Sequence, residues 1–520
     1  MKTKIYFLLL IAWSIWSCYE DKGNYDYREV NEVAFTFSPA SNSGDNTNTY
    51  VYRQPSLDTL SVTYRPVISQ TLKENAANLA YRWIVVGEKD YRDTVESLEL
   101  TLKFFPKVKT EYKVLFRLTD LDDNVSYHTM LTMKTQLPFM RSYLVLHGKP
   151  GDRQIGAIEN PDSANSLITY DVYQELFGER KFENAEHLLY CGRNGVSVAK
   201  LDSYEQLIVT GPDSVDYMYA YDFVIRKRYE DIIPNLDMPR ITGGFAVNTS
   251  HYCMLMDEQH KLYHSGGEGS FFSLKASPVL ENYKADKIYT SDNDYTTIWD
   301  EANRKLMYYF NGGNYYSAGA ANSNRSLLTY APFRTTYTAT DGSVKNREVI
   351  WLGKRLNTGE GREGATLLVK DTVYTFHQIN YNVQNEQVKI DSIVIKRMDI
   401  DGNSCFATSL AFANQLFYST GHSLYVLNLA SGEVRQLYNA GGMISQIQFR
   451  AVNRLDSSLD KNENFKLAVV VNKGDKGEVH DLYFSQAADL IDVKVHSGFG
   501  PIQDIVYTIV MWNMFDEVKI

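Results

Sequence analysis

A strand–turn–strand unit recurs along most of this chain and constrains its fold more than any other feature. In each copy an apolar strand runs into a polar turn, and an aromatic-rich strand follows. The copies are Leu207–Tyr221, His251–Gly267, Tyr295–Gly313, Ala365–Asn380, Gln415–Tyr438 and Phe465–Gln486. Taking Tyr217, Tyr263, Tyr308, Tyr374, Tyr425 and Tyr483 as equivalent, successive copies lie roughly 45 to 66 residues apart.

This spacing favours a β-propeller over residues 138–520. A propeller blade of four strands repeats every 40 to 50 residues or so, and loop insertions lengthen some repeats. An incomplete copy at Tyr143–Glu159 brings the expected number of blades to about seven. The final segment, Ile502–Met511, is a strand without a hairpin of its own, so we expect it to pair with the first blade and close the ring. A solenoid of the same hairpins is the structural alternative.

Residues 30–137 predict a separate β-sandwich. Short strands with turn punctuation and almost no helical periodicity are expected at Val33–Phe37, Leu57–Tyr64, Ala80–Val86, Leu98–Phe104, Glu111–Thr119 and Ser126–Lys134. Trp83 is expected to be buried between the two sheets. The 38 Tyr and 24 Phe of the chain suit pleated, half-buried surfaces, so the whole protein is expected to be all-β.

The first 29 residues predict a compartment. Lys2 and Lys4 precede the apolar run Ile5–Trp16, which is too short to span a membrane and is typical of a signal peptide over residues 1–17. Ser17-Cys18 resembles a bacterial lipobox, in which the cysteine carries the lipid, although Trp16 departs from the usual pattern. Ordinary secretory cleavage is the alternative. If Cys18 carries the lipid, residues 18–29 form a lipidated tether.

The string Asp21-Lys22-Gly23-Asn24-Tyr25-Asp26-Tyr27, after the lipobox, resembles the start of the PKD-like lipoproteins of Bacteroidota. The Tyr81-Arg82-Trp83 strand and the run Tyr112–Asp120 resemble PKD and related immunoglobulin-like modules. The resemblance implies an outer-membrane lipoprotein that faces the cell exterior, together with a Sus-type TonB-dependent transporter and its lid lipoprotein as partners. It also implies an accessory role in capturing an oligomeric glycan or peptide.

The segment from Asn311 to Arg325 is the best candidate for ligand contact. It is rich in Gly, Ser and Asn, and it carries the adjacent pair Tyr315 and Tyr316. Polar loops with aromatic side chains on a rigid scaffold are common binding devices. The same reasoning applies more weakly to Tyr337. A solvated loop without a ligand is the alternative.

Other motifs are explained better as ordinary structure. Gly359–Gly364 matches G-x-G-x-x-G, but a β-type run follows where a dinucleotide site needs a helix. His251, Cys253, Asp257, His260 and His264 are interpreted as strand and turn residues, and Asp120, Asp122, Asp123 and Asp399–Asn403 as turns. Cys191, Cys253 and Cys405 are interpreted as buried thiols, with one disulfide left open. We therefore predict no metal, no cofactor and no catalytic residue.

Function is open among three classes. A formal net charge of −10 and the lack of a basic stripe argue against nucleic acid as a partner. Capture of a glycan or peptide without turnover is the favoured hypothesis. A propeller enzyme acting on glycan or peptide and a purely structural or partner-docking lipoprotein are the alternatives.

Overall fold

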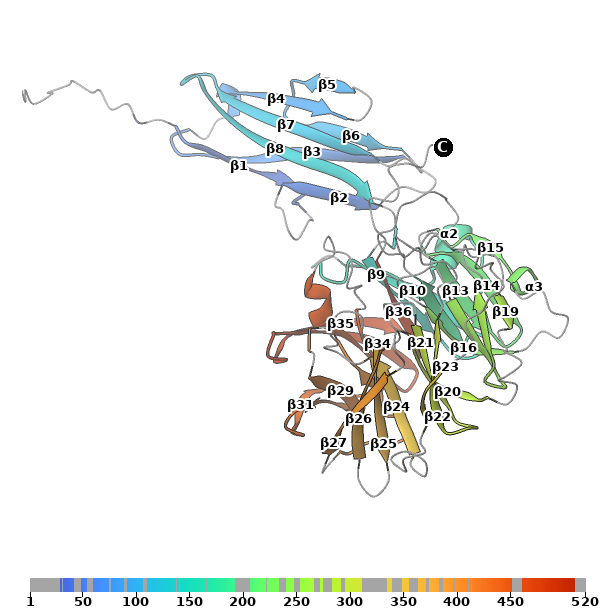
Figure 1. Ribbon diagram of the computed structural model, residues 1–520. Helices are drawn as coiled ribbons and strands as arrows, with labels where there is room; N and C mark the ends of the chain where they lie inside the picture. Colours follow the sequence, from blue (N-terminus) through green and yellow to red (C-terminus); the bar gives the residue numbers. More distant parts are fainter. Residues whose placement is uncertain are drawn as a thin grey trace, which may run out of the picture. The chain divides into compact units, whose positions relative to one another are not determined.

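The computed structural model describes a chain that forms two compact units, Met1–Thr135 and Gln136–Ile520, almost entirely from strands (Figure 1). The structure describes residues 29–509. Within that range it leaves out residues 30, 42–47, 54–58, 74–75, 88–90, 106–109, 137, 140, 164–165, 192–205, 221, 233–239, 247–252, 266–271, 275–282, 291–294, 311–333, 339–347, 355–362, 371–373, 383–386, 396–397, 410, 413 and 451–460.

The first unit consists of two antiparallel sheets that face each other across one core. One sheet has the order β1 (Val33–Ser38), β3 (Leu60–Gln70), β6 (Leu100–Phe104). The other has the order β2 (Thr49–Arg53), β8 (Val125–Gln136), β7 (Glu111–Asp120), β4 (Leu79–Val86), β5 (Arg92–Val95). A single 3₁₀ turn, η1 (Ala76–Asn78), precedes β4. The predicted sandwich strands are present, and β2 and β5 are additional strands that the sequence analysis did not predict.

The core of this unit forms around Trp83, as expected. Trp83 is fully buried in β4, its ring centroid lies 4.3 Å from that of Phe116, and its indole N–H donates to the carbonyl of Ser97 at 3.0 Å. Strands β4 and β7 alternate buried and outward residues, which is why one face of the sheet packs on the core and the other stays open to solvent.

The described part of the second unit forms seven four-stranded antiparallel sheets (Figure 1). The first three are β36 (Ile502–Ile509), β9 (Arg141–His147), β10 (Gln154–Glu159), β11 (Leu167–Thr169); β12 (His187–Cys191), β13 (Gln206–Gly211), β14 (Ser214–Tyr219), β15 (Ile225–Lys227); and β16 (Ile241–Ala246), β17 (Cys253–Asp257), β18 (Leu262–Ser265), β19 (Phe272–Leu274). The fourth and fifth are β20 (Ala285–Thr290), β21 (Tyr295–Asp300), β22 (Lys305–Phe310), β23 (Arg334–Thr338); and β24 (Glu348–Lys354), β25 (Glu363–Lys370), β26 (Tyr374–Asn382), β27 (Gln387–Ile395). The last two are β28 (Phe406–Ala407), β29 (Gln415–Thr420), β30 (Ser423–Asn428), β31 (Val434–Asn439); and β32 (Met443–Phe449), β33 (Lys466–Lys473), β34 (Lys476–Phe484), β35 (Leu490–Phe499).

The recurring unit of the sequence is the central hairpin of these sheets. In each of the six complete copies, the two strands that the pattern predicts are the second and third of their sheet, and the six equivalent tyrosines all lie in third strands. The turns between these strands are short. Asp257, at the end of β17, accepts hydrogen bonds from the backbone N–H groups of Gln259 and Lys261, at 2.9 and 2.8 Å. Asp300 closes the next hairpin in the same way. Turn chemistry therefore sets the hairpin ends.

The C-terminal strand completes the first sheet, as predicted from its lack of a hairpin partner. Strand β36 pairs with β9 along its length, with Val506 opposite Leu144 and Tyr507 opposite Tyr143. It takes the place that β12, β16 and the other first strands hold in their sheets. The first and last parts of the second unit are thus joined by backbone hydrogen bonds.

Neighbouring sheets pack face to face through apolar clusters. Such clusters join the first sheet to the second, the second to the third, the third to the fourth, the fifth to the sixth, the sixth to the seventh, and the seventh to the first. Strand β20 of the fourth sheet lies against β24 of the fifth. The fold is therefore all-β and propeller-like.

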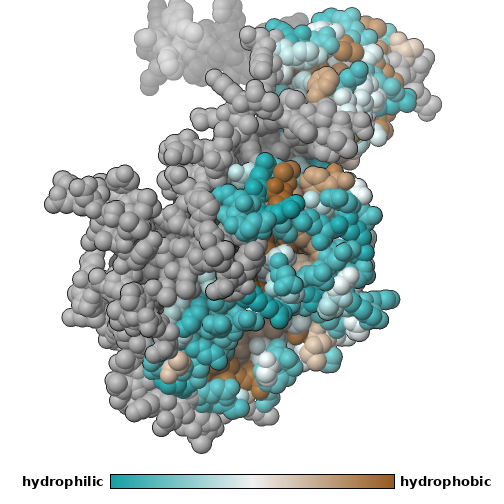
Figure 2. Space-filling model, turned by 90° about the vertical axis from the view of Figure 1, so that its right-hand side faces the viewer, coloured by the Kyte–Doolittle hydropathy of each residue, from teal (hydrophilic) through white to brown (hydrophobic). Residues whose placement is uncertain are grey.

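Within the described ranges of the second unit, helices are few and short. They are α2 (Val172–Phe177), α3 (Tyr229–Ile232) and the 3₁₀ turn η5 (Lys461–Phe465). Among the described residues none of these could cross a membrane. Figure 2 shows one face of the molecule, where hydrophilic residues predominate on the described surface and hydrophobic residues form small separate patches.

Candidate functional site

Most of the residues predicted to contact a ligand or lipid lie outside the described residues: Cys18, Tyr315 and Tyr316. Tyr337 lies in β23, the fourth strand of the fourth sheet, where its backbone is opposite Leu306 of β22. The structure thus places the strands on either side of the Tyr315–Tyr316 segment. Residues 311–333 join the third and fourth strands of their sheet, whereas the corresponding connections are only 220–224 and 383–386 in two other sheets.

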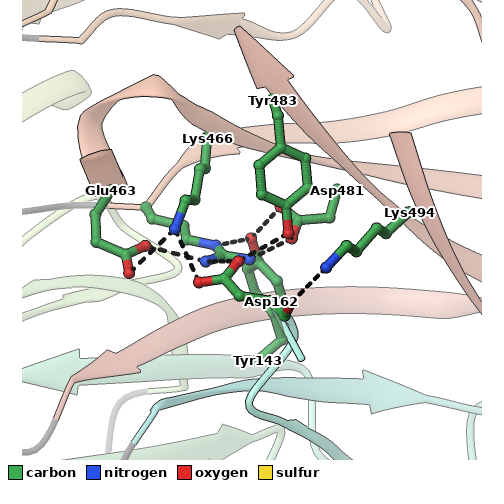
Figure 3. Close-up of polar contacts among 8 residues, drawn as sticks. Tyr143, Asp162, Glu463, Lys466, Asp481, Tyr483 and Lys494 are labelled. Carbon is green, nitrogen blue, oxygen red and sulfur yellow. Dashed lines mark hydrogen bonds and ion pairs between the residues drawn. The ribbon is translucent and has the colours of Figure 1, made fainter. Parts of the chain in front are cut away.

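A polar centre with a buried core, which sequence reasoning missed, lies between the seventh sheet and the first, and its Asp162 is 37% exposed (Figure 3). We call it the Arg450 cluster, and its members are Tyr143, Asp162, Arg450, Glu463, Lys466, Asp481, Tyr483 and Lys494. These side chains come from β9, from the connection after β10, and from the segments β32 to β35. They bring together positions that are about 300 residues apart in the sequence, such as Tyr143 and Asp481.

Arg450 is the centre of this cluster and its side chain is fully buried. The guanidinium donates from Nε to the Tyr143 hydroxyl at 2.7 Å and from Nη1 to Asp162 and Glu463 at 2.9 and 3.0 Å. From Nη2 it donates to Asp481. The planar fork of arginine suits such multiple carboxylate contacts, which a lysine could not make.

A second cation and a tyrosine complete the contacts of Asp162. Lys466 donates to the Asp162 carboxylate at 2.8 Å, and Lys494 donates to its backbone carbonyl. The hydroxyl of Tyr483 contacts both Asp162 and Asp481, at 2.8 and 2.9 Å. Because β34 carries Asp481 and Tyr483 two residues apart, both point to the same side of the sheet.

Aromatic rings surround the guanidinium of Arg450. Its Cζ atom lies 4.8 Å from the ring centroid of Tyr507 in β36 and 5.1 Å from that of Tyr143 in β9. Tyr143 and Tyr507 are opposite each other in the pairing that joins the C-terminal strand to the first sheet. The cation therefore rests on the strand pair that joins the C-terminal strand to the first sheet, where burial strengthens a cation–π contact.

Burial and charge act against each other in this cluster. Burial raises the pKa of Asp162, but Arg450 and Lys466 more than offset it, so that the pKa lies well below its usual range. Burial raises the pKa of Asp481, with Arg450 opposing the rise only in part. Three carboxylates face three cations, so the cluster as a whole is close to neutral.

This arrangement fits a structural role better than it fits ligand capture. Its carboxylates are engaged by cations and hydroxyls of the chain itself, and Arg450 has no exposed surface to offer a ligand. The cluster joins the last sheet to the first through hydrogen bonds and ion pairs. The net stabilisation from such a network is small, because the cost of removing the charges from water offsets their attraction.

His496 lies beside this cluster in β35. It is buried, and among its described surroundings its Nε2 atom has no hydrogen-bond partner. Burial, together with Arg450 and Lys494, lowers the pKa of His496 to about 4. The imidazole is therefore neutral at physiological pH.

Of the other candidate motifs, Asp257, His260 and Asp120 lie at turns, whereas His251 and the side chains of Cys253 and His264 lie outside the described residues. Asp257 closes a hairpin, and the Nδ1 atom of His260 lies 2.8 Å from the carbonyl of Ala285. Asp120 is buried at a turn, where Asn31 donates to it at 2.7 Å and, with other donors, lowers its pKa to about 2. Among the described residues no group of three or more His, Cys, Asp or Glu side chains could hold a metal ion.

Two further motifs lie at least partly within the described residues. The strand β25 begins within the G-x-G-x-x-G segment and continues as Glu363–Lys370, so a strand follows the glycines where a dinucleotide site requires a helix. Asp401 accepts a hydrogen bond from the N–H of Asn403 at 2.8 Å, as in an Asx turn. Cys405 is a free, half-buried thiol whose Sγ contacts the carbonyl of Ser445. The side chains of Cys191 and Cys253 lie outside the described residues.

Comparison with known families places the first part of the chain. Residues 18–183 match the PKD-like family. The match begins at Cys18 and covers the sandwich together with the start of the second unit. No curated protein matches the chain.

Among solved structures, the chain is similar to a quinonprotein alcohol dehydrogenase-like protein from Bacteroides thetaiotaomicron, with 11% identity, a TM-score of 0.40, and coverage of 89% of this chain and 97% of that one. It is also similar to the dihydro-heme d1 dehydrogenase NirN, with 12% identity, a TM-score of 0.35, and coverage of 84% and 76%. A third is YCF48 from Cyanidioschyzon merolae, with 12% identity, a TM-score of 0.36, and coverage of 65% and 95%. Similarities this distant carry no information about the function of this chain.

Proposed function

We propose that this chain is an outer-membrane lipoprotein that captures an oligomeric glycan or peptide at the cell surface without chemically changing it. Cys18 carries the lipid, residues 18–29 form the tether, and a TonB-dependent transporter of the Sus type, with its lid lipoprotein, receives the ligand. The second unit is a closed propeller of seven blades. The seven sheets, the pairing of β36 with β9, and the Arg450 cluster support closure of the ring.

One observation carries the binding part of this proposal. The connection 311–333, which holds Tyr315 and Tyr316, is far longer than the equivalent connections in the other sheets, and it leaves from the paired strands β22 and β23. A long polar segment that starts and ends on a fixed scaffold is a common way to present binding residues. Tyr337, in β23, belongs to the same sheet.

Support for the anchor comes from the extent of the family match. The PKD-like match begins at residue 18, the cysteine of the lipobox-like sequence. Several acyl chains give stable membrane retention, whereas one alone is marginal. After a wash at high salt, which screens any contact between exposed charges and the membrane, Cys18→Ala should therefore move the protein from the membrane fraction to the soluble fraction, with loss of metabolic palmitate labelling. Unchanged fractionation and labelling would show that the anchor is elsewhere.

The binding test is calorimetric titration of the chain with candidate glycans and peptides, with product release assayed in parallel. An aromatic contact is worth about 1 kcal/mol, so Tyr315→Ala/Tyr316→Ala should weaken binding by roughly 10- to 30-fold. Tyr91→Ala removes an exposed tyrosine of the first unit and is the matched control, with no expected effect.

Each other result selects an alternative. Turnover of a glycan or peptide would favour an enzyme. Binding that the double variant leaves unchanged would refute the assignment of the two tyrosines. No binding to any oligomer, together with a stable complex with the transporter, would favour a docking protein.

A further inference from the structure

The outward face of the five-stranded sheet in the first unit concentrates positive charge. Its basic residues, which we call the basic face, are Arg82, Arg92, Lys113, Arg117 and Lys134. They lie on one side of the sheet because the alternate residues of β4, β7 and β8 point into the core. Arg82 is directly opposite Arg117, and Val86 is opposite Lys113, so the charges form neighbouring rows.

An apolar row runs between these charges. Ile84 of β4 is opposite Leu115 of β7, which is opposite Met130 of β8. Met130 is 52% exposed, although a large apolar side chain on an open sheet gains nothing from contact with water. The face therefore combines an apolar centre with a cationic border.

Few acidic side chains neutralise this face. Glu96 pairs with Arg82, and Glu111 is opposite Lys134 in the sheet. In the described part of the chain no acidic side chain is paired with Arg92, Lys113 or Arg117. This excess of positive charge runs against the formal net charge of the whole chain, which is −10.

The opposite face of the same sandwich has a different character. The outward residues of β3 and β6 are mostly hydroxylic, and the Thr63 and Thr101 hydroxyl oxygens lie 2.8 Å apart. Its cations are few: Arg65 pairs with Glu99, and Lys103 lies opposite Ser61. The basic face is thus a property of one sheet and not of the sandwich in general.

We propose that the basic face docks on an anionic lipid surface. Each Lys or Arg close to such a surface strengthens binding roughly fivefold, and a row of apolar side chains reaches the interfacial region between the headgroups. That the sandwich lies close to a membrane rests on the lipid anchor of the proposed function. Strand β1 begins at Val33, so a chain anchored at Cys18 holds the sandwich within about 50 Å of the membrane.

The test measures binding to vesicles by co-sedimentation, using the chain from residue 18 onward with Cys18→Ala, so that neither the apolar leader nor a lipid contributes. Vesicles of phosphatidylglycerol and phosphatidylcholine in equal parts should bind the protein, and vesicles of phosphatidylcholine alone should not. Binding should fall as salt is raised, because salt screens exposed charges. Lys113→Gln/Arg117→Gln should weaken it by roughly 30-fold, and Met130→Ser by about fivefold.

The matched control is Arg65→Gln/Lys103→Gln, which removes the same charge from the opposite face and should leave binding unchanged. All variants should keep the circular dichroism spectrum and melting temperature of the parent. Equal binding to both kinds of vesicle, or equal loss in the control variant, would overturn the proposal. Binding to a soluble acidic polysaccharide but not to anionic vesicles would also overturn it. Because the lipid anchor is absent from this assay, its outcome is independent of the fractionation of Cys18→Ala.

Discussion

The two faces of the last sheet, β32–β35, are held to their neighbours in opposite ways. Towards the sixth sheet, contact is made by apolar side chains, among which the rings of Phe417 and Phe449 lie 4.9 Å apart and those of Phe417 and Phe484 lie 5.4 Å apart. Towards the first sheet, an apolar cluster is joined by the buried Arg450 cluster.

This difference follows the distance in the sequence between the sheets that are in contact. The sixth and seventh sheets are consecutive in the chain, so a short connection already brings them together. The seventh and first sheets come from opposite ends of the unit, and β36 has to find β9 across more than 300 residues. Apolar contacts are not directional, whereas the hydrogen-bonded ion pairs of the Arg450 cluster are. We infer that the Arg450 cluster fixes the register of closure, and the predictions below test this contrast.

The largest effect is expected from Arg450→Met. The substitution leaves Asp481 and Glu463 buried without their main cation, so it should lower the free energy of unfolding by about 3 to 5 kcal/mol. Urea denaturation followed by tryptophan fluorescence measures this loss. A cost of less than about 1 kcal/mol would show that the network is dispensable.

Replacing the partners together with Arg450 provides the control. Arg450→Met/Asp481→Leu/Glu463→Leu removes the unpaired charges, so most of the lost stability should return. If stability returns but the variant shows broadened or multiple unfolding transitions, the network specifies closure more than it stabilises it. A single sharp transition would argue against a role in specifying register.

The second effect concerns pH. The folded protein holds His496 neutral down to about pH 4, whereas the unfolded chain takes up a proton near pH 6.5. The unfolded state therefore binds more protons in this interval, and stability should fall as the pH falls, by up to about 3 kcal/mol. His496→Leu should flatten this part of the profile. An equally steep profile in the variant would assign the acid sensitivity to other groups, such as His480, whose pKa burial also lowers.

The sequence predicts the strands and their apolar packing well, but it does not predict the Arg450 cluster. Alternating strands with a tyrosine in the second strand of each copy locate the central hairpins, and a lone strand at Ile502–Met511 indicates closure. These signals are local, because a strand pattern needs only neighbours two residues apart.

The Arg450 cluster leaves no local signal of this kind. Arg450 follows an ordinary strand, Asp162 lies in an ordinary turn, and Tyr483 was counted as one more tyrosine of the repeat. Their partnership exists only once β9 and β34 face each other. Candidate ligand residues are predicted from composition alone, and Tyr315 and Tyr316 therefore stay predictions.

The third effect is expected from Tyr483→Phe, which removes one hydroxyl and keeps the ring. Because this hydroxyl contacts both Asp162 and Asp481, its loss should cost about 2 kcal/mol. The cost should be constant down to about pH 4 and shrink only as the pH falls further, through the depressed pKa of Asp162, because the carboxylate that the hydroxyl contacts becomes protonated only there. Urea denaturation at several pH values measures both, and a cost that does not change with pH would show that the hydroxyl acts only through packing.

The smallest effect tests the apolar face of the same sheet. Ile444 lies in β32, the strand that ends just before Arg450, and its buried side chain packs towards the sixth sheet. Ile444→Val removes one methylene group, so it should cost about 1 kcal/mol. Because no titrating group is involved, this cost should be the same between about pH 4 and pH 8, and raised salt should not change it. Combined with Arg450→Met, the two losses should add, because the substitutions lie on opposite faces of the sheet and share no partner. Non-additivity above about 0.5 kcal/mol would mean that the two interfaces are coupled through β32. The interfaces would then differ in chemistry but would not stabilise the sheet independently.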